Sequence, residues 1–296
     1  MSSSIRRPLS SGGLPVPDSL IMKQTDAPIY SDSCYLLVDG LAMDVPFTAY
    51  NLDDHPITEP LFRGTRHTEV IEASPWLVKP SAKGRLLAST ESWRSDGVVV
   101  YSDAPMNVLA NHLRSLISIT LPSDQLAYCR FYAPNWSSRL FSSMSTGEFE
   151  AWSGPITQWR VFTKGTWQSY VSKATGAPRH THEEGWYKLR ERQLKQWEAE
   201  EYQRFVDKTA LDLGCRPEHQ NYVHQREQID NLIQQAHEDG FTLEHQCLHY
   251  LELAWRFPQE FSRQGWAREL LANPEQSANQ RLQLAEKQLF GLDKDV

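Results

Sequence analysis

The sequence contains no long hydrophobic run, and its longest purely apolar stretches, such as 35–38 and 98–101, are only a few residues long. A helix that crosses a membrane needs roughly 20 apolar residues, so we do not expect this chain to cross one. The segment after Arg6 and Arg7 is rich in Ser, Gly and Pro, unlike the apolar core of a secretion signal peptide. These absences predict a cytoplasmic protein.

Cysteine is scarce, with 4 in 296 residues, and no two of them form a C-x-x-C pair. A chain of this length can bury a hydrophobic core without disulfide bonds, so we expect four free thiols, at Cys34, Cys129, Cys215 and Cys247. The first two lie in apolar runs, where a cysteine is usually a small buried residue rather than a nucleophile.

The usual catalytic and nucleotide-binding motifs are also missing: there is no G-x-x-x-x-G-K-[ST], G-x-G-x-x-G, G-x-S-x-G or H-E-x-x-H. Positive charge is not in excess, since 30 Lys and Arg stand against 37 Asp and Glu, a net charge of -7. A protein that coats nucleic acid has a basic face. We therefore expect no enzymatic activity, no cofactor, no metal, and neither nucleic acid nor a membrane as a partner.

Composition divides the chain into three parts. Residues 1–30 are rich in Ser, Gly and Pro without periodicity, which predicts a flexible leader. Across 31–170, short β-branched runs alternate with helical patterns, which predicts a mixed α/β lobe with helices packed on one central sheet. Residues 171–296 carry amphipathic helical patterns and most of the negative charge, which predicts an all-α helical lobe. The fold class is therefore α+β.

Individual elements follow from local patterns. In the first lobe we expect strands at 34–40, 75–80, 97–101 and 158–162, a hairpin over 119–132, and helices at 65–73, 84–91, 103–117 and 136–144. In the second lobe we expect helices at 183–208, 218–238, 242–257, 259–271 and 275–290.

Tryptophan is abundant, with 10 residues in the chain. Trp136, Trp152, Trp159 and Trp167 fall in predicted loop or edge contexts. Large aromatic side chains in such places favour protein interfaces, because they bury much area with few rotatable bonds. An equally good interpretation is that these tryptophans cover the seam between the two lobes.

Histidines suggest two metal candidates. His245, His249 and Glu252 share one face of a predicted helix, and two imidazoles with a carboxylate can bind a cation. The opposite helix face is apolar, so the pattern is also typical of the solvent side of an amphipathic helix. His180 and His182 lie in a polar linker, where the following glutamates suit the start of a helix. We expect neither group to bind metal, and keep a metal-dependent enzyme that uses the first group as the alternative function.

Several strings of the first lobe occur in a recognisable order. They are Y-L-L-V-D-G (35–40), L-F-R-G-T (61–65), S-P-W-L-V (74–78), L-A-N-H-L-R (109–114), L-P (121–122), R-F-Y-A-P (130–134) and G-P-I-T-Q-W (154–159). In this order and spacing they resemble the domain of the type VI secretion effector chaperones, also called adaptors (the Tap/Tec/VasW-like family). The resemblance covers about residues 34–160, and the helical lobe is similar to the looser C-terminal region of those proteins. One departure is Ala133, where the family string R-F-Y-D-P has Asp.

The resemblance implies a non-enzymatic function. Such adaptors bind a specific toxic effector in the cytoplasm of the producing bacterium and load it onto the VgrG spike, directly or through a PAAR-type tip. We expect the effector to contact residues in or beside the matching strings, namely Asp39, Trp76, Arg130, Tyr132 and Trp159, although each of them can instead serve the fold. A self-assembling structural component of the secretion apparatus is a further alternative.

Overall fold

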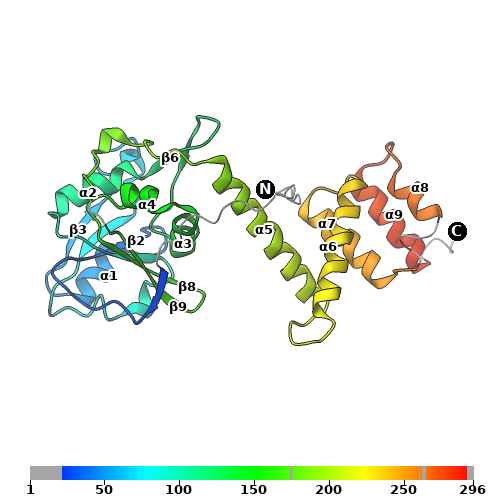
Figure 1. The fold of residues 1–296 in the computed structure, drawn as a ribbon, viewed down its shortest axis with the longest axis horizontal. Coiled ribbons are helices and arrows are strands. Elements are labelled where there is room, and N and C mark those ends of the chain that lie inside the picture. The colour runs from blue at the N-terminus through cyan, green and yellow to red at the C-terminus, as the bar shows by residue number, and fades with distance from the viewer. Residues whose placement is uncertain (1–21, 174–175, 260, 262–264, 292–296) are drawn as a thin grey trace. The chain divides into compact units, whose positions relative to one another are not determined.

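The computed structural model describes residues 22–173, 176–259, 261 and 265–291. These residues form two compact units, which divide between Leu194 and Lys195. The sheet unit is the part up to Leu194, and the helical unit is the part from Lys195 onward (Figure 1). The predicted α+β class, with a sheet-containing part followed by an all-α part, is confirmed.

A seven-stranded antiparallel sheet is the centre of the sheet unit (Figure 1). Its strands, in spatial order, are β1 (Met22–Thr25), β9 (Thr166–Val171), β8 (Gln158–Thr163), β5 (Gly97–Tyr101), β2 (Cys34–Val38), β4 (Trp76–Lys79) and β3 (Ile57–Pro60). All five residues of β2 are buried, because the strand has neighbours on both sides and side chains packed on both faces. A strand covered on both faces has a continuous apolar run rather than an alternating pattern.

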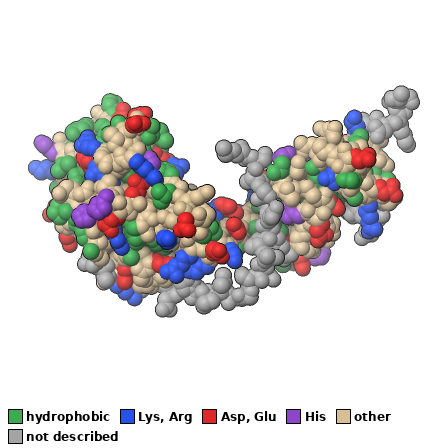
Figure 2. All heavy atoms as spheres, turned by 90° about the horizontal axis from the view of Figure 1, so that it is seen from above, with side chains coloured by type: hydrophobic (Ala, Val, Ile, Leu, Met, Phe, Trp, Pro, Cys, Tyr) green, Lys and Arg blue, Asp and Glu red, His purple; other side chains and the backbone are tan. Residues whose placement is uncertain are grey.

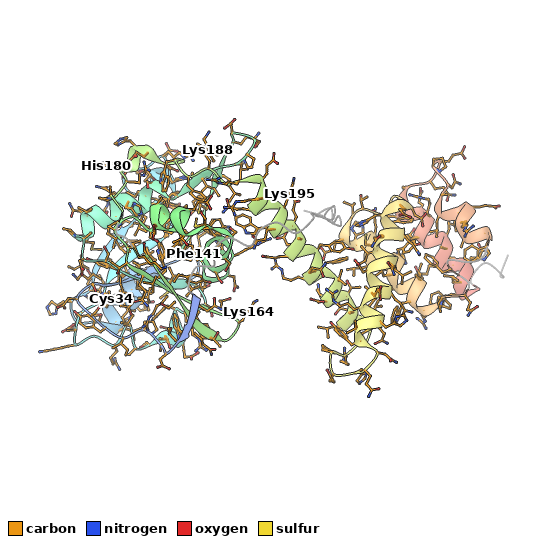
Figure 3. All side chains as sticks on the ribbon, viewed as in Figure 1. Cys34, Phe141, Lys164, His180, Lys188 and Lys195 are labelled. Atoms are coloured by element: carbon orange, nitrogen blue, oxygen red, sulfur yellow. The ribbon has the colours of Figure 1, made fainter. Side chains whose placement is uncertain are left out.

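Four helices accompany this sheet: α1 (Val45–Leu52), α2 (Met106–Ser115), α3 (Pro134–Ser143) and α4 (Thr146–Ser153). Val45 and Ala49 of α1 join one hydrophobic cluster with Leu36 and Val38. On the other face, Phe141 of α3, which Figure 3 labels, packs against Trp159, with 5.1 Å between the two ring centroids. Burial of each such large side chain contributes about 1.5–3 kcal/mol. Within the described residues, three short 3-10 helices lie in the connections, at Thr68–Ala73, Thr90–Ser92 and Thr181–Glu183.

A second, smaller sheet is formed by the hairpin of β6 (Ser118–Thr120) and β7 (Leu126–Tyr128). A third segment joins it, because Lys188 forms a parallel bridge with Thr120. The amide of Thr120 donates to the carbonyl of Tyr187, and the amide of Leu189 donates to the carbonyl of Thr120, both at 2.8 Å. These bonds attach the segment before α5 to the sheet unit, so the units divide near residue 194, whereas the sequence placed the boundary near residue 170.

The helical unit consists of α5 (Glu191–Asp212), which begins in the sheet unit, followed by α6 (Tyr222–Glu238), α7 (Glu244–Arg256), α8 (Gly265–Leu271) and α9 (Ala278–Phe290). Its core includes Val206, Ile233, Cys247 and Leu282, which come from four of these helices. Gly240 ends α6 with a φ of 86°, a conformation that glycine adopts without steric cost.

Some predicted elements differ from the structure. Residues 22–25 belong to the predicted flexible leader but form β1, which pairs with β9; residues 1–21 lie outside the described part of the chain. Residues 84–91 do not form a regular helix, and the 3-10 helix Thr68–Ala73 buries no residue. The sequence patterns also missed β9, α1 and α4.

The surface is mixed in character. Figure 2 shows acidic, basic and hydrophobic side chains interspersed on the face that it presents. Among the described residues, no helix has the length and apolar character needed to cross a membrane.

Candidate functional site

The first feature of the site is an ion pair at the end of β2. Asp39 follows β2 directly, and its side chain is only 3% exposed. One carboxylate oxygen accepts the amide of Leu41 at 3.0 Å, and the other lies 2.5 Å from the guanidinium of Arg130. The Arg130 side chain is 56% exposed, so a buried carboxylate holds an accessible cation in place.

Two tyrosines continue the site beside this ion pair. The hydroxyl groups of Tyr128 and Tyr132 lie 2.9 Å apart, and the guanidinium of Arg130 lies 6.0 Å from the Tyr132 ring centroid. Burial, together with the hydrogen bond between the two phenols, raises the pKa of Tyr128 well above its ordinary value. Both phenols therefore remain neutral hydrogen-bonding groups at physiological pH.

A second charged group lies on the other side of Tyr128. The ring of Tyr128 packs edge-on against Phe62 and His67, at centroid distances of 6.1 and 5.7 Å. His67 and Arg66 both pair with Glu184, at 3.5 and 3.2 Å. Tyr128 thus connects the Arg130–Asp39 pair with a second group of ionisable side chains.

Exposed apolar side chains accompany these charges. Leu41 is 75% exposed, and Leu126 and Tyr128, which share one face of β7, are 49% and 43% exposed. We call Leu41, Leu126, Tyr128 and Arg130 together the Arg130 surface. Exposed apolar and aromatic groups around a positioned arginine are typical of protein-binding surfaces.

The structure brings four of the five predicted contact residues to the end of β2. Asp39, Arg130 and Tyr132 form the network above, and Trp76 lies opposite Val38, the last residue of β2. Gly40 packs so closely on Trp76 that an added Cβ would lie 3.0 Å from the indole ring. Arg130 is exposed and Trp76 is half-buried, whereas Asp39 and Tyr132 are buried; all four stay predictions as effector-binding residues.

Trp159 is the exception. Its side chain is fully buried, and its indole N–H donates to the hydroxyl of Ser153 at 3.1 Å. A direct contact with an effector does not fit this position, because a core side chain has no surface to offer. Asp39 and Tyr132 are also buried, but they hold the exposed side chains of Arg130 and Tyr128. Trp152 and Trp167 are also buried, so their role as exposed interface anchors does not fit either.

Tyr128, Leu41 and Leu126 are parts of the Arg130 surface that sequence reasoning missed. The alternation of Leu126 and Tyr128 in the predicted hairpin was an available signal, because it places both side chains on one face. Leu41 had no comparable signal, since its exposure depends on the turn that Asp39 stabilises.

The side chains of the two histidine groups are arranged as follows. Within the described parts of the chain, no three His, Cys, Asp or Glu side chains converge closely enough to hold a metal ion. His249 pairs with Glu286 at 3.2 Å, and His245 and Glu252 are exposed. The rings of His180 and His182 stack on each other at 5.5 Å.

The four cysteines are free, as predicted, and all of them are buried, whereas the sequence predicted burial only for Cys34 and Cys129. Burial raises the pKa of the Cys34 and Cys247 thiols to about 12, and that of Cys129 well above its ordinary value. A nucleophilic cysteine needs a thiolate, so these environments oppose nucleophilic catalysis.

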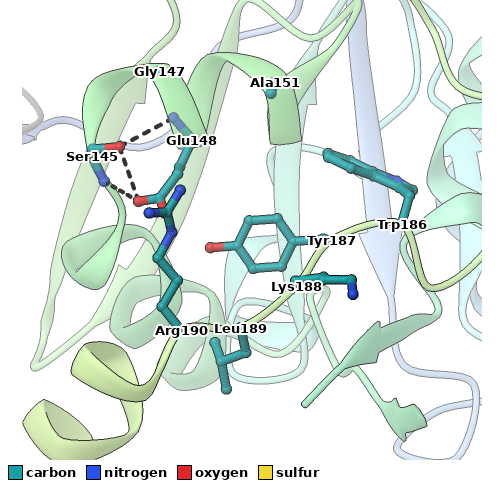
Figure 4. A pocket seen from close by; sticks show the side chains of 9 residues that line it. All are labelled: Ser145, Gly147, Glu148, Ala151, Trp186, Tyr187, Lys188, Leu189 and Arg190. Carbon is teal, nitrogen blue, oxygen red and sulfur yellow. Dashed lines mark hydrogen bonds and ion pairs between the residues drawn. The ribbon is translucent and has the colours of Figure 1, made fainter. Parts of the chain in front are cut away.

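A cleft of about 720 Å³ lies between α4 and the segment 186–190 (Figure 4). Gly147, Glu148 and Ala151 form the helical wall, and Trp186 and Lys188 lie on the opposite segment. Glu148 is bound by Ser145, Arg190 and Arg192, with the Arg190 contact at 2.6 Å. Burial alone would raise the pKa of Glu148, but the hydrogen bonds from Ser145 and Arg192 lower this pKa below its usual value.

Residues 34–151 match the model of a domain of unknown function, DUF4123. The match extends from β2 into α4 and contains Asp39, Trp76, Arg130 and Tyr132, but not Trp159. No curated protein and no solved structure matches the chain.

Proposed function

We propose that this protein is a non-enzymatic chaperone, or adaptor, of the type VI secretion system. In this role it binds a specific effector in the cytoplasm and loads it onto the VgrG or PAAR spike for delivery. The observation that carries the proposal is the match of residues 34–151 to DUF4123, a domain associated with such adaptors.

The surface of the matched domain supports a binding function. Its exposed apolar groups are Leu41, Leu126 and Tyr128, which come from the same two segments as the Asp39–Arg130 ion pair, and Arg130 is held by a buried carboxylate. Tyrosine and arginine are enriched among the residues that dominate binding energy in protein interfaces. The sheet unit therefore offers a suitable surface for gripping the effector.

Affinity purification from the producing bacterium tests the proposal. Tagged protein is expressed at its native level, and the proteins that co-purify are identified by mass spectrometry. We expect one toxin-like protein together with a VgrG or PAAR component. A Tyr128→Ala, Arg130→Ala double variant should lose the toxin-like protein, because it removes two groups at the centre of the Arg130 surface.

Phe47→Ala is the matched control, because Phe47 is an exposed aromatic residue of α1 outside the Arg130 surface. Retention of the partner by this variant and its loss from the double variant would support the proposal. Recovery of no toxin-like protein above the untagged background would contradict it. A symmetric oligomer without an effector would favour a structural component instead.

A further inference from the structure

The segment 186–190 behaves as an edge strand. Tyr187 and Leu189 are buried, whereas Lys188 and Arg190 are exposed, which is the alternation of a strand. The carbonyl of Tyr187 and the amide of Leu189 bond to Thr120 on one side. In a parallel pair the intervening residue directs its own amide and carbonyl to the other side.

The backbone of Lys188 has no hydrogen-bond partner among the described residues, although it forms part of the cleft lining. Such a free strand edge can accept one more strand. On the helical wall opposite, Gly147 has no side chain and Ala151 has a small one, so these two positions of α4 take up little of the cleft (Figure 4). The cleft volume of about 720 Å³ lies within the range of roughly 300–1,000 Å³ that is typical of ligand sites.

The charge of the cleft favours one kind of occupant. Lys188 and Arg190 have side chains that are 73% and 64% exposed, whereas the carboxylate of Glu148 is 12% exposed and is already bound by two arginines. Lys188 also pairs with Asp124 at 3.4 Å, although both side chains are exposed. The three cations Lys188, Arg190 and Arg192 therefore stand against the two carboxylates of Glu148 and Asp124, which leaves one positive charge in excess at the cleft, in a chain with a net charge of -7. Trp186 adds an aromatic wall beside the cations.

We propose that this cleft binds an extended, acidic segment of the partner protein, which adds as a strand to the free edge at Lys188. Main-chain hydrogen bonds to Lys188 give the affinity, and Lys188 and Arg190 select carboxylate side chains. The inference deepens the proposed function, since the segment is taken to belong to the effector.

A synthetic peptide tests the cleft without the natural partner. The probe is a capped octapeptide of alternating valine and glutamate, titrated into the full-length, isotope-labelled protein while backbone amide resonances are recorded. We expect saturable shifts at Lys188 and Gly147, with weaker binding at higher salt. The same peptide with lysine in place of glutamate should not bind.

Two pairs of variants, each a test variant with its control, separate the parts of the proposal. Ala151→Trp fills the cleft from an exposed position, and Ala82→Trp is its control at an exposed alanine outside the lining. Lys188→Pro removes an amide that makes no bond within the described structure, while Lys188→Ala keeps that amide. We expect Ala151→Trp and Lys188→Pro to weaken binding by at least about tenfold, and Lys188→Ala by about threefold.

Equal binding of the two peptides, no binding of the acidic peptide, or unchanged binding by Ala151→Trp would overturn the inference. An unfolding curve matching that of the parent protein shows that each variant is folded. If the effector still co-purifies while the peptide does not bind, the inference fails and the adaptor proposal stands. If no effector co-purifies while the peptide binds as expected, the adaptor proposal fails and the cleft assignment stands.

Discussion

The carboxylate of Asp39 is buried at the end of β2, and the guanidinium of Arg130 lies 2.5 Å away in a half-exposed position. An ion in a protein interior is costly unless a counter-ion and hydrogen bonds compensate it. Asp39 therefore fixes Arg130, and Arg130 in turn keeps the carboxylate neutralised. The pair connects β2 to the residues that follow β7, which are distant in the chain.

Arg130→Ala should destabilise the protein, because it leaves the Asp39 carboxylate buried without its cation. Breaking a fully buried pair costs about 3–5 kcal/mol, and solvent screening at the exposed guanidinium reduces this to about 1–3 kcal/mol. Urea unfolding measures the change. Arg63→Ala is the control, because the Arg63 side chain is 62% exposed in its ion pair with Glu59, and we expect less than about 1 kcal/mol. Equal effects of the two variants would contradict the role given to Asp39.

Trp159→Ala should reduce stability rather than affect a binding surface directly. The loss of a buried tryptophan costs about 3–5 kcal/mol, because it removes apolar contacts and leaves a cavity. Tyr128→Ala, at a 43% exposed position, should cost less stability but should weaken partner binding. Urea unfolding and partner co-purification, measured on both variants, check this. A Trp159→Ala protein that keeps the parent's stability would show that the indole is not packed in the core.

Native protein should react slowly with a thiol reagent such as Ellman's reagent. All four cysteines are buried, and burial raises the pKa of Cys34 and Cys247 to about 12, so thiolate is rare at neutral pH. In concentrated guanidinium chloride all four should react at once. Rapid reaction of any cysteine in the folded protein would contradict its burial.

The fold could be predicted where a local pattern agrees with the tertiary environment. The buried apolar runs of β2 and β5, and the helical spacing of α2, were sufficient signals. The strand β9 was missed because its turn, Lys164-Gly165, lacks the usual Asn-Gly or Asp-Gly pair, although both residues adopt positive φ values of 51° and 76°. The short, polar β1 is a strand because β9 offers it an edge, which no local pattern reveals.

The site was predicted only in part, for a related reason. The family strings pointed to Asp39 and Arg130 as separate residues, but their contact depends on how the hairpin folds back on the sheet. Trp159 was expected at an edge because the sequence did not show β9 beside its strand. The exposure of an aromatic residue is set by its neighbours in space, and a single sequence contains little information about those neighbours.

His112 should make the protein less stable in mild acid. Its ring is buried, with Nε2 2.9 Å from the carbonyl of Trp152 and Nδ1 accepting the amide of Arg179 at 3.1 Å. Since a carbonyl only accepts and an amide only donates, the ring is neutral, with its proton on Nε2. A second proton would meet the Arg179 amide, and burial lowers the pKa of His112 to about 4.

The direction of the pH effect follows from this lowered pKa. In the unfolded chain a histidine has a pKa near 6.5, so between about pH 6.5 and pH 4 the unfolded state binds more protons than the folded state. The stability that depends on the neutral ring is complete above about pH 6.5 and falls by about 3 kcal/mol as the pH approaches 4.

Carboxylates also titrate in this range, so His112→Gln is the matched comparison. We expect this variant to be less stable than the parent at neutral pH but to lose less on acidification, as measured by urea unfolding at several pH values. Parallel losses in both proteins would show that His112 is not the group responsible.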